Sequence, residues 1–264
     1  MEGRIEVSVP ISGSPEQVAG KVSIRRFRPG DEPEVRAICF DTGFQGKPAS
    51  LWLDTNPALF TDLWLLYYLR ETPDQVYVAE QDHKVVGYLA GCVDIPARER
   101  YYRWRFPWIL LAGFCRGRYR LGRRTLRVLA RHLRDGWVHG RPQARSDKPC
   151  AEFHCNVRED LRGRRDRFGF LLTRAFLGEM KRLGLTRLRA SAVVRKEEAE
   201  GRYRFVAKQY EVRPTTIYEE AAAGAYVLVD GYADFEDPEL PDWWRRYWAG
   251  AQPVEALSGR EVPA

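Results

Sequence analysis

The sequence has few of the residues from which metal sites and disulfide frameworks are built. Its five cysteines are an odd number without a CxxC pair, and its four histidines are scattered. A disulfide scaffold normally shows an even, regularly spaced set of cysteines, and a zinc site shows closely spaced Cys and His pairs. We therefore expect free thiols in a reducing, cytoplasmic setting, and no metal site.

Long apolar runs are also missing. No run of about 18 apolar residues is present, which is the length that a membrane-spanning helix needs. The opening residues, MEGRIEVSVPISGSPEQ, hold no apolar segment of signal-peptide length. We therefore expect no spanning helix, no leader and no membrane partner. A hydrophobic content of 44% and 264 residues are typical of a globular chain with ample length for a core.

Positive charge is concentrated in one segment. The formal net charge is +7, but residues 98–148 alone carry +12, so the remainder of the chain is acidic at −5. This uneven distribution argues against general nucleic-acid binding. The basic segment also interleaves arginine with Tyr and Trp. Four interpretations stay open for it: a packed, solvated helical excursion, recognition of an acidic or carboxylate-bearing ligand, a homodimer contact, and nucleic-acid binding.

Alternation and helical periodicity predict the order of elements along the chain. Strands are predicted at 21–27, 76–80, 85–93, 151–157, 186–194, 211–218 and 225–235. Helices are predicted at 56–70, 168–183, 196–208 and within the tail segment PELPDWWRRYWAG. A short helix with Val35, Ile38 and Cys39 on its apolar face is also predicted, and it is expected to begin with a capping box formed by Asp31 and Glu34. Gln81 to Lys84 is expected to form a hairpin turn.

These elements predict one α/β (α+β) domain at 22–235, preceded by a loose arm at 1–21 and followed by an aromatic tail at 236–264. A basic, aromatic insertion at 94–149 interrupts the strand pattern after the third strand. Within it, LRVLARHL is helical, with Leu126, Leu129, Ala130 and Leu133 on one apolar face.

The stretch from Cys150 to Met180 reads as a strand, a basic turn and an amphipathic helix that begins at Phe168. The first N–H groups of a helix have no intrahelical partner, and the helix dipole adds positive charge, so this unit suits an anion. Flanking arginines strengthen the attraction for phosphate. The alternative is a solvated loop before an ordinary helix.

Several segments resemble the GNAT superfamily of acyl-CoA-dependent N-acetyltransferases. VSIRRFRPGDEPEV resembles the family's opening strand, and VYVAEQDHKVVGYLAG resembles its hairpin. AEFHCNVREDLRG resembles the acetyl-CoA motif, with His154, Asn156, Arg162 and Gly163 in register, and YRFVAKQYEV echoes the motif near the family's end. The match covers residues 21–232, apart from the insertion. It implies a mixed, mostly antiparallel central sheet flanked by helices, with a helical insertion after the third strand. It also implies that the central strand, which contains Cys155 to Val157, splays from its neighbour and pairs with the pantetheine arm of acetyl-CoA.

The resemblance departs from the family pattern in the pyrophosphate loop. If Arg162 opens the motif, Arg165 and Arg167 replace both glycines. If the helix start is aligned instead, Phe168 and Gly169 match and the loop carries two extra residues. We prefer the second alignment, because the amphipathic stripe fixes where the helix begins. Arginine would also be costly where the backbone must approach a ligand closely. The family's tyrosine aligns with Phe205, and Tyr203 is nearby.

The resemblance implies transfer of an acetyl group from acetyl-CoA, as co-substrate, to a small-molecule or protein amine by direct attack. Glu152 and His154 are the candidate proton acceptors, since strand alternation places them with Asn156 on one face. Tyr203 is the candidate acid. The acetyl-CoA site is expected from Cys155, Asn156, Val157, Arg162, Gly163, Arg164, Arg165, Arg167, Phe168 and Gly169. A catalytically degenerate binding domain is the main alternative.

Overall fold

The computed structural model describes residues 22–54, 56–139, 148–197, 199, 209–218 and 225–254. Its strands are β1 (Val22–Arg26), β2 (Val76–Gln81), β3 (Lys84–Cys92), β4 (Cys150–Val157), β5 (Arg187–Arg195), β6 (Gln209–Thr215) and β7 (Tyr226–Asp234). Its longer helices are α1 (Glu32–Asp41), α2 (Pro57–Glu71), α4 (Phe106–Cys115), α5 (Arg123–His139), α6 (Arg165–Arg182) and α8 (Asp242–Ala249). The short helix α3 (Ile95–Arg100) and the π-helical η4 (Tyr101–Arg105) lead into α4.

The strands form a seven-stranded sheet in the order β1-β2-β3-β4-β5-β7-β6. Every neighbouring pair is antiparallel except β4 and β5, which are parallel. The sheet is therefore mixed and mostly antiparallel, as the sequence predicted. The predicted hairpin is also present, and Asp82 and His83 occupy its turn with φ of 50° and 63°, the conformation that a tight two-residue hairpin turn requires.

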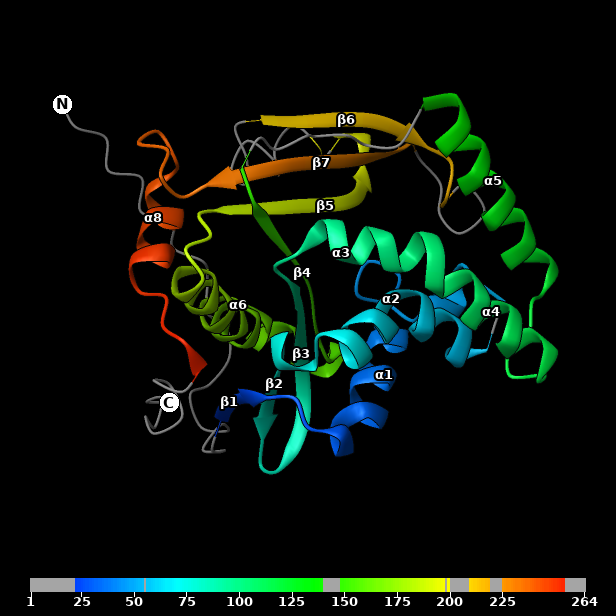
Figure 1. Cartoon of the computed structure of the whole chain (residues 1–264), viewed down its shortest axis with the longest axis horizontal. Helices are drawn as coiled ribbons and strands as arrows, with labels where there is room; N and C mark the ends of the chain where they lie inside the picture. The colour runs from blue at the N-terminus through cyan, green and yellow to red at the C-terminus, as the bar shows by residue number, and fades with distance from the viewer. Residues whose placement is uncertain are drawn as a thin grey trace.

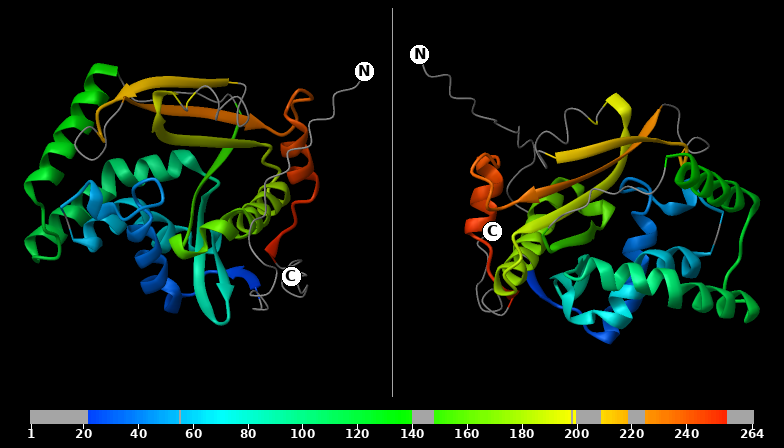
Figure 2. Two further views of the ribbon diagram at one scale, coloured as in Figure 1. Left: turned by 180° about the vertical axis from the view of Figure 1, so that it is seen from behind. Right: turned by 45° about the horizontal axis from the view of Figure 1, so that its top comes forward.

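Helices cover both faces of the sheet (Figure 1). On one face, α1 and α2 form an apolar cluster with β2 and β3, which includes Val35, Leu65, Val78 and Tyr88. On the other face, α6 packs its predicted stripe, Phe168, Leu172, Phe176 and Met180, against the same strands. Figure 2 shows α6 and α8 together on this second side. The core thus lies in two layers separated by β3 and β4.

The predicted cap of α1 is not formed. Asp31 precedes α1, but its side chain makes no capping hydrogen bond to the helix. Its carboxylate instead accepts both terminal nitrogens of Arg25, at 2.7 and 2.8 Å, and the backbone N–H of Arg28 at 2.7 Å. A bidentate pair with a guanidinium is stronger than a neutral cap bond, so the carboxylate turns toward β1.

The insertion after β3 is helical, as predicted, and it lies along one side of the domain. Tyr101, Phe106 and Val128 bury their side chains in the cluster under α2. Its last helix, α5, takes its N-terminal cap from a residue about 70 positions earlier. The carboxylate of Asp54 accepts the backbone N–H groups of Arg124, at 3.0 Å, and Thr125, at 2.6 Å.

The far end of α5 is held by a second carboxylate. Asp135 accepts the backbone N–H of Thr216 at 2.7 Å and the hydroxyl of Thr215 at 3.1 Å. Burial opposes the charged form, but these donors together hold the pKa of Asp135 below its usual value. The helix is therefore attached to the α1–α2 connection at one end and to the end of β6 at the other (Figures 1 and 2).

Candidate active site

The sheet opens between its two parallel strands. β4 pairs with β3 along its length, from Cys92↔Glu152 to Gly87↔Val157. It pairs with β5 only over Cys150–Glu152, because β5 follows β7 for its whole length. Figure 1 shows β4 running across the direction of β5. Within the described residues, the pairing of β4 with β5 therefore ends at Glu152, and the two strands diverge beyond it.

The predicted pyrophosphate segment lies at the wide end of this opening. After β4, residues 159–164 form the 3₁₀ helix η5, which contains Arg162, Gly163 and Arg164. Helix α6 begins at Arg165, so Arg167, Phe168 and Gly169 lie in its first turns. The prediction that the helix begins at Phe168 was wrong by three residues. Its apolar stripe begins at Phe168, but Arg165, Asp166 and Arg167 already belong to the helix. Apolar periodicity does not mark a helix start that consists of polar residues.

Three polar side chains of β4 share one face, as alternation predicted. Glu152, His154 and Asn156 point toward α2, whereas Ala151, Phe153, Cys155 and Val157 pack with α6 on the other face. The ring of His154 stacks on Trp64 of α2, with centroids 5.8 Å apart and planes at 18°. Asn156 Nδ2 lies 3.0 Å from the hydroxyl of Tyr88. The polar side chains of this face therefore lie directly against the aromatic rings of Trp64 and Tyr88.

His154 is held as a neutral imidazole. Its Nε2 lies 2.8 Å from Asn156 Nδ2. An amide nitrogen can only donate, so Nε2 accepts and the ring proton lies on Nδ1. Burial lowers the pKa of His154 to about 4, because a charged imidazolium would lose its hydration there. At neutral pH the ring therefore carries no charge.

Glu152 lies between two arginines. Arg98, from α3 in the insertion, forms an ion pair with its Oε1, and Arg189 of β5 approaches its Oε2 at 3.8 Å. The hydroxyl of Tyr68 lies 3.5 Å from Oε1 and accepts a hydrogen bond from Arg98 at 2.9 Å. Burial raises the pKa of Tyr68 beyond its ordinary value. Glu152 is thus a paired carboxylate with a protonated phenol beside it.

Arg189 also holds a buried carboxylate on β7. Its Nε and Nη2 donate to the two oxygens of Asp230 at 3.0 and 2.8 Å, and the Asp230 side chain is only 1% exposed. The network therefore runs from Arg98 through Glu152 and Arg189 to Asp230. It crosses the three residue pairs that join β4 to β5, so it stabilises the narrow end of the opening.

Sequence reasoning missed several residues of this site. Trp64 and Tyr68 are four positions apart and therefore share one face of α2, but the helix is apolar nearly all round, which hid that face. Asp230 had a signal, since it is a carboxylate in the middle of the mostly apolar run YVLVDGYA. Arg98 had none, because it is one of fourteen arginines in its segment. The predicted acid Tyr203, and Phe205, lie outside the described residues.

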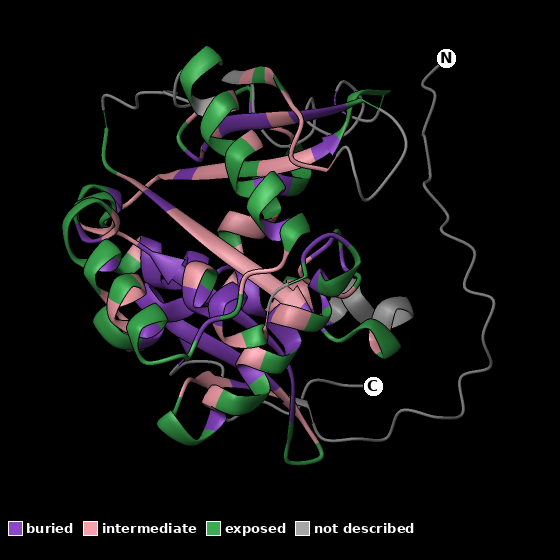
Figure 3. Ribbon diagram, turned by 90° about the vertical axis from the view of Figure 1, so that its right-hand side faces the viewer, coloured by how far each residue is buried: buried purple, intermediate pink, exposed green. Residues whose placement is uncertain are grey.

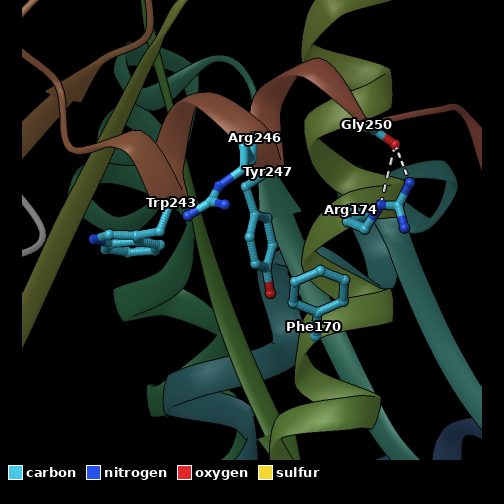
Figure 4. Close-up of a pocket in the computed structure, with 6 residues that line it drawn as sticks. All are labelled: Phe170, Arg174, Trp243, Arg246, Tyr247 and Gly250. Carbon is cyan, nitrogen blue, oxygen red and sulfur yellow. Dashed lines mark hydrogen bonds between the residues drawn. The ribbon is translucent and has the colours of Figure 1, made fainter. Parts of the chain in front are cut away.

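A separate cavity of about 350 Å³ lies between α6 and α8. Figure 4 shows Phe170, Trp243 and Tyr247 around it, with the guanidinium of Arg246 between the last two side chains. Arg174 donates its Nε to the carbonyl of Gly250 at 3.0 Å. This cavity faces away from the polar face of β4. Among the described residues, no group of three or more His, Cys, Asp or Glu side chains is arranged to hold a metal.

Comparison with known proteins agrees with this topology. No family model and no curated protein matches the sequence. The crystal structure of SsHAT aligns with a TM-score of 0.53 at 21% identity and covers 80% of this chain and 98% of its own. A GCN5-related N-acetyltransferase from Kribbella flavida aligns over 81% and 98%, with a TM-score of 0.43 and 12% identity. The structure of yncA from Salmonella typhimurium with its cofactor acetyl-CoA covers 84% of this chain and 98% of its own, with a TM-score of 0.44 and 13% identity.

The chain has the GNAT fold. The mixed seven-stranded sheet, the opening between β4 and β5, and the helix that follows β4 were all expected from the resemblance in sequence. In this GNAT fold the sequence-predicted residues Cys155 to Val157 lie on the part of β4 that has diverged from β5. The insertion is an addition beside α2, and it contributes Arg98 to the polar face.

Proposed function

We propose that this protein is a GNAT-type acyltransferase that moves an acetyl group from acetyl-CoA to an amine. The observation that carries the proposal is the divergence of β4 from β5 after Glu152, beside the N-terminal end of α6. An extended amide-containing chain can pair with a strand edge, and a helix N-terminus favours phosphate. The two parts of acetyl-CoA that need these partners are its pantetheine arm and its pyrophosphate.

The proposed binding roles follow the chain. Backbone groups of Cys155 to Val157 pair with the pantetheine arm. The first N–H groups of α6, from Arg165 to Gly169, together with Arg162 to Arg164 of η5, hold the pyrophosphate. The thioester then lies toward the narrow end of the opening, where β4 and β5 meet at Glu152 and Arg189. The amine enters from the side of Trp64 and His154.

The proposed chemistry is a direct transfer. The amine nitrogen forms a bond to the acetyl carbonyl carbon, the carbon–sulfur bond breaks, and the thiolate of CoA takes up a proton. We assign the proton released by the amine to Glu152, directly or through water, with Arg98 free to shift toward Tyr68 as Glu152 is neutralised. His154, with a pKa of about 4, stays neutral and positions Asn156. Tyr203 keeps its predicted role as the acid.

Binding and turnover are tested separately. Acetyl-CoA at about 100 times its Kd should raise Tm by about 5 °C or more. Turnover should be followed by mass spectrometry of acetylated amines, because Cys115 is exposed and would react with a thiol reagent. Glu152→Gln should keep the Tm shift and lose about 100-fold or more in rate. His154→Gln should lose about tenfold or less. No Tm shift at millimolar acetyl-CoA would overturn the proposal.

A second function, acyl-CoA binding without catalysis, is favoured by one observation. Glu152 is engaged by both Arg98 and Arg189, so the carboxylate is already occupied by two cationic partners. The two functions differ in one result. A Tm shift with acetyl-CoA but no acetylated product with any amine, including peptide N-termini, would favour the binding domain.

A further inference from the structure

The insertion carries an apolar surface that the domain does not cover. On α5, Leu126, Leu129, Leu133 and Trp137 recur at helical spacing, and Leu133 and Trp137 are 72% and 87% exposed. The face that packs on the domain is a different one, with Thr125 and Val128 buried. The apolar face predicted from LRVLARHL is therefore turned outward. Figure 3 looks onto this side, where much of the α5 ribbon is coloured as exposed.

The preceding helical stretch repeats the pattern. Trp104 of η4 and Trp108 of α4 are each 70% exposed, and Leu111 and Phe114 of α4 are also exposed. Their opposite side packs inward through Tyr101, Phe106 and Gly113. Each stripe is a run of exposed apolar side chains at helical spacing, the kind of surface that marks an interaction site. We call these two stripes, residues 104–114 and 126–137, the insertion face.

The insertion face is accompanied by positive charge and no negative charge. No Asp or Glu occurs between Glu99 and Asp135, whereas eleven arginines do. Arg105 pairs with Glu71 and Arg118 with Asp62, both on α2. The remaining arginines include Arg103, Arg116, Arg123 and Arg124, whose side chains are exposed. Asp135 itself is bonded to Thr215 and Thr216.

We propose that the insertion face binds the surface of an anionic phospholipid bilayer. Arginines attract the headgroups, and Trp and Leu side chains enter the boundary between headgroups and acyl chains, as on interfacial amphipathic helices. No helix among the described residues is long and apolar enough to cross a membrane, so the protein lies on the bilayer. From the sequence we expected no membrane partner. That expectation rested on the lack of long apolar runs, which bears on spanning helices and not on binding at the bilayer surface.

Two other occupants fit the surface less well. A second copy would bring two arginine-rich faces together with no carboxylate between Glu99 and Asp135 to offset them. Nucleic acid would pair with the arginines, but a phosphate backbone offers nothing to Leu126, Leu133 and Leu111. A bilayer with anionic headgroups satisfies both kinds of side chain. The fixed ends of α5, at Asp54 and Asp135, keep its apolar stripe facing outward.

Co-sedimentation with vesicles tests the proposal. The full chain should bind phosphatidylcholine vesicles containing 30% phosphatidylserine and bind pure phosphatidylcholine at least tenfold more weakly. Leu133→Ser with Trp137→Ser should reduce binding to the anionic vesicles by about tenfold or more. Arg103→Glu with Arg123→Glu should do the same and should flatten the salt dependence. Leu183→Ser and the pair Lys47→Glu with Lys84→Glu, exposed elsewhere, serve as controls and should bind as the parent does.

Three results would overturn the proposal. The first is no binding to anionic vesicles at low salt. The second is a concentration-dependent dimer, measured by light scattering, that Leu133→Ser with Trp137→Ser abolishes while vesicle binding is unchanged. The third is single-stranded nucleic acid binding, lost in the arginine variant, that is tighter than vesicle binding. Circular dichroism of each variant establishes that it is folded.

Discussion

Asn156 donates to the Nε2 of His154 at 2.8 Å, two residues back along the same strand. The same amide lies 3.0 Å from the hydroxyl of Tyr88, so it connects β3 to the polar face of β4. Burial raises the pKa of Tyr88 well above its ordinary value, and the group stays a neutral phenol. The three side chains therefore form an uncharged hydrogen-bonded set beside the paired carboxylate of Glu152.

The neutral state of His154 predicts an acid-sensitive fold. Its pKa is about 4 in the folded chain and about 6.5 when unfolded. Between these values the unfolded chain binds a proton that the folded chain does not, so stability is full above pH 6.5 and falls as pH falls toward 4. The loss is on the order of 2 kcal/mol. His154→Gln should remove this part of the decline in a denaturant titration series, while His132→Gln, on the exposed side of α5, should leave it. If the unfolding free energy fell equally steeply with pH in both variants, the acid sensitivity would not come from His154.

The Arg189–Asp230 pair predicts a large effect of breaking it. Asp230 is almost fully enclosed, and the Arg189 side chain is 14% exposed. Asp230→Asn leaves the guanidinium without its bidentate partner and should cost about 3 kcal/mol of unfolding free energy. Replacing both, as Arg189→Met with Asp230→Leu, should recover most of that loss. If the double variant is as unstable as Asp230→Asn, the pair is not the source of the effect.

The contact between α6 and the segment after α8 predicts opposite effects for two glycines of one helix. A methyl group at Gly178 would collide with the backbone of Gln252 and Pro253, whereas one at Gly169 meets open space. Gly178→Ala should therefore lower Tm by several degrees. Gly169→Ala should raise stability by about 0.5–1 kcal/mol through helix propensity alone. Thermal unfolding of both variants checks the contrast, and a stable Gly178→Ala would show that residues 250–254 do not pack on α6 in solution.

The remote cap of α5 gives a fourth prediction. Asp54 accepts two backbone N–H groups of α5 and the hydroxyl of Thr125 at 2.8 Å. Although desolvation opposes it, these donors lower the pKa of Asp54 to about 2. Asp54→Ala should free the first turn of α5 and increase amide exchange there severalfold, since two backbone N–H groups of that turn lose the carboxylate that accepts them. Asp41→Ala, an exposed carboxylate at the end of α1, is the matched control and should leave exchange in α5 unchanged.

Local patterns predicted the elements that built the fold. Alternation placed Glu152, His154 and Asn156 on one face of β4, and helical periodicity gave the buried stripe of α6. These signals lie within a few residues of each other, so the sequence contains them directly. The β4–β5 opening was expected only through resemblance, because no local pattern records where a strand loses its neighbour.

What the sequence could not show depends on distant pairing. Asp54 caps a helix that begins 69 positions later, and Arg98 reaches Glu152 across more than 50 residues. Asp31 had the spacing of a cap but paired with Arg25, since a guanidinium competes better than an N–H group. The outward apolar face of α5 was predicted as a face but not as an exposed one, because amphipathicity fixes which residues align and not what they contact.

The few residue pairs between β4 and β5 have a mechanical consequence. The sheet consists of two rigid parts, β1–β4 and β5–β7, joined by hydrogen bonds at Cys150–Glu152 alone. Helix α5 is attached to both parts, since Asp54 lies in the α1–α2 connection beside the first and Thr215 and Thr216 belong to the second. From Arg123 to Asp135 it extends about 18 Å at 1.5 Å per residue. It is therefore a brace across the opening, in addition to the apolar core that α6 shares with Leu188 and Ala233 of the second part.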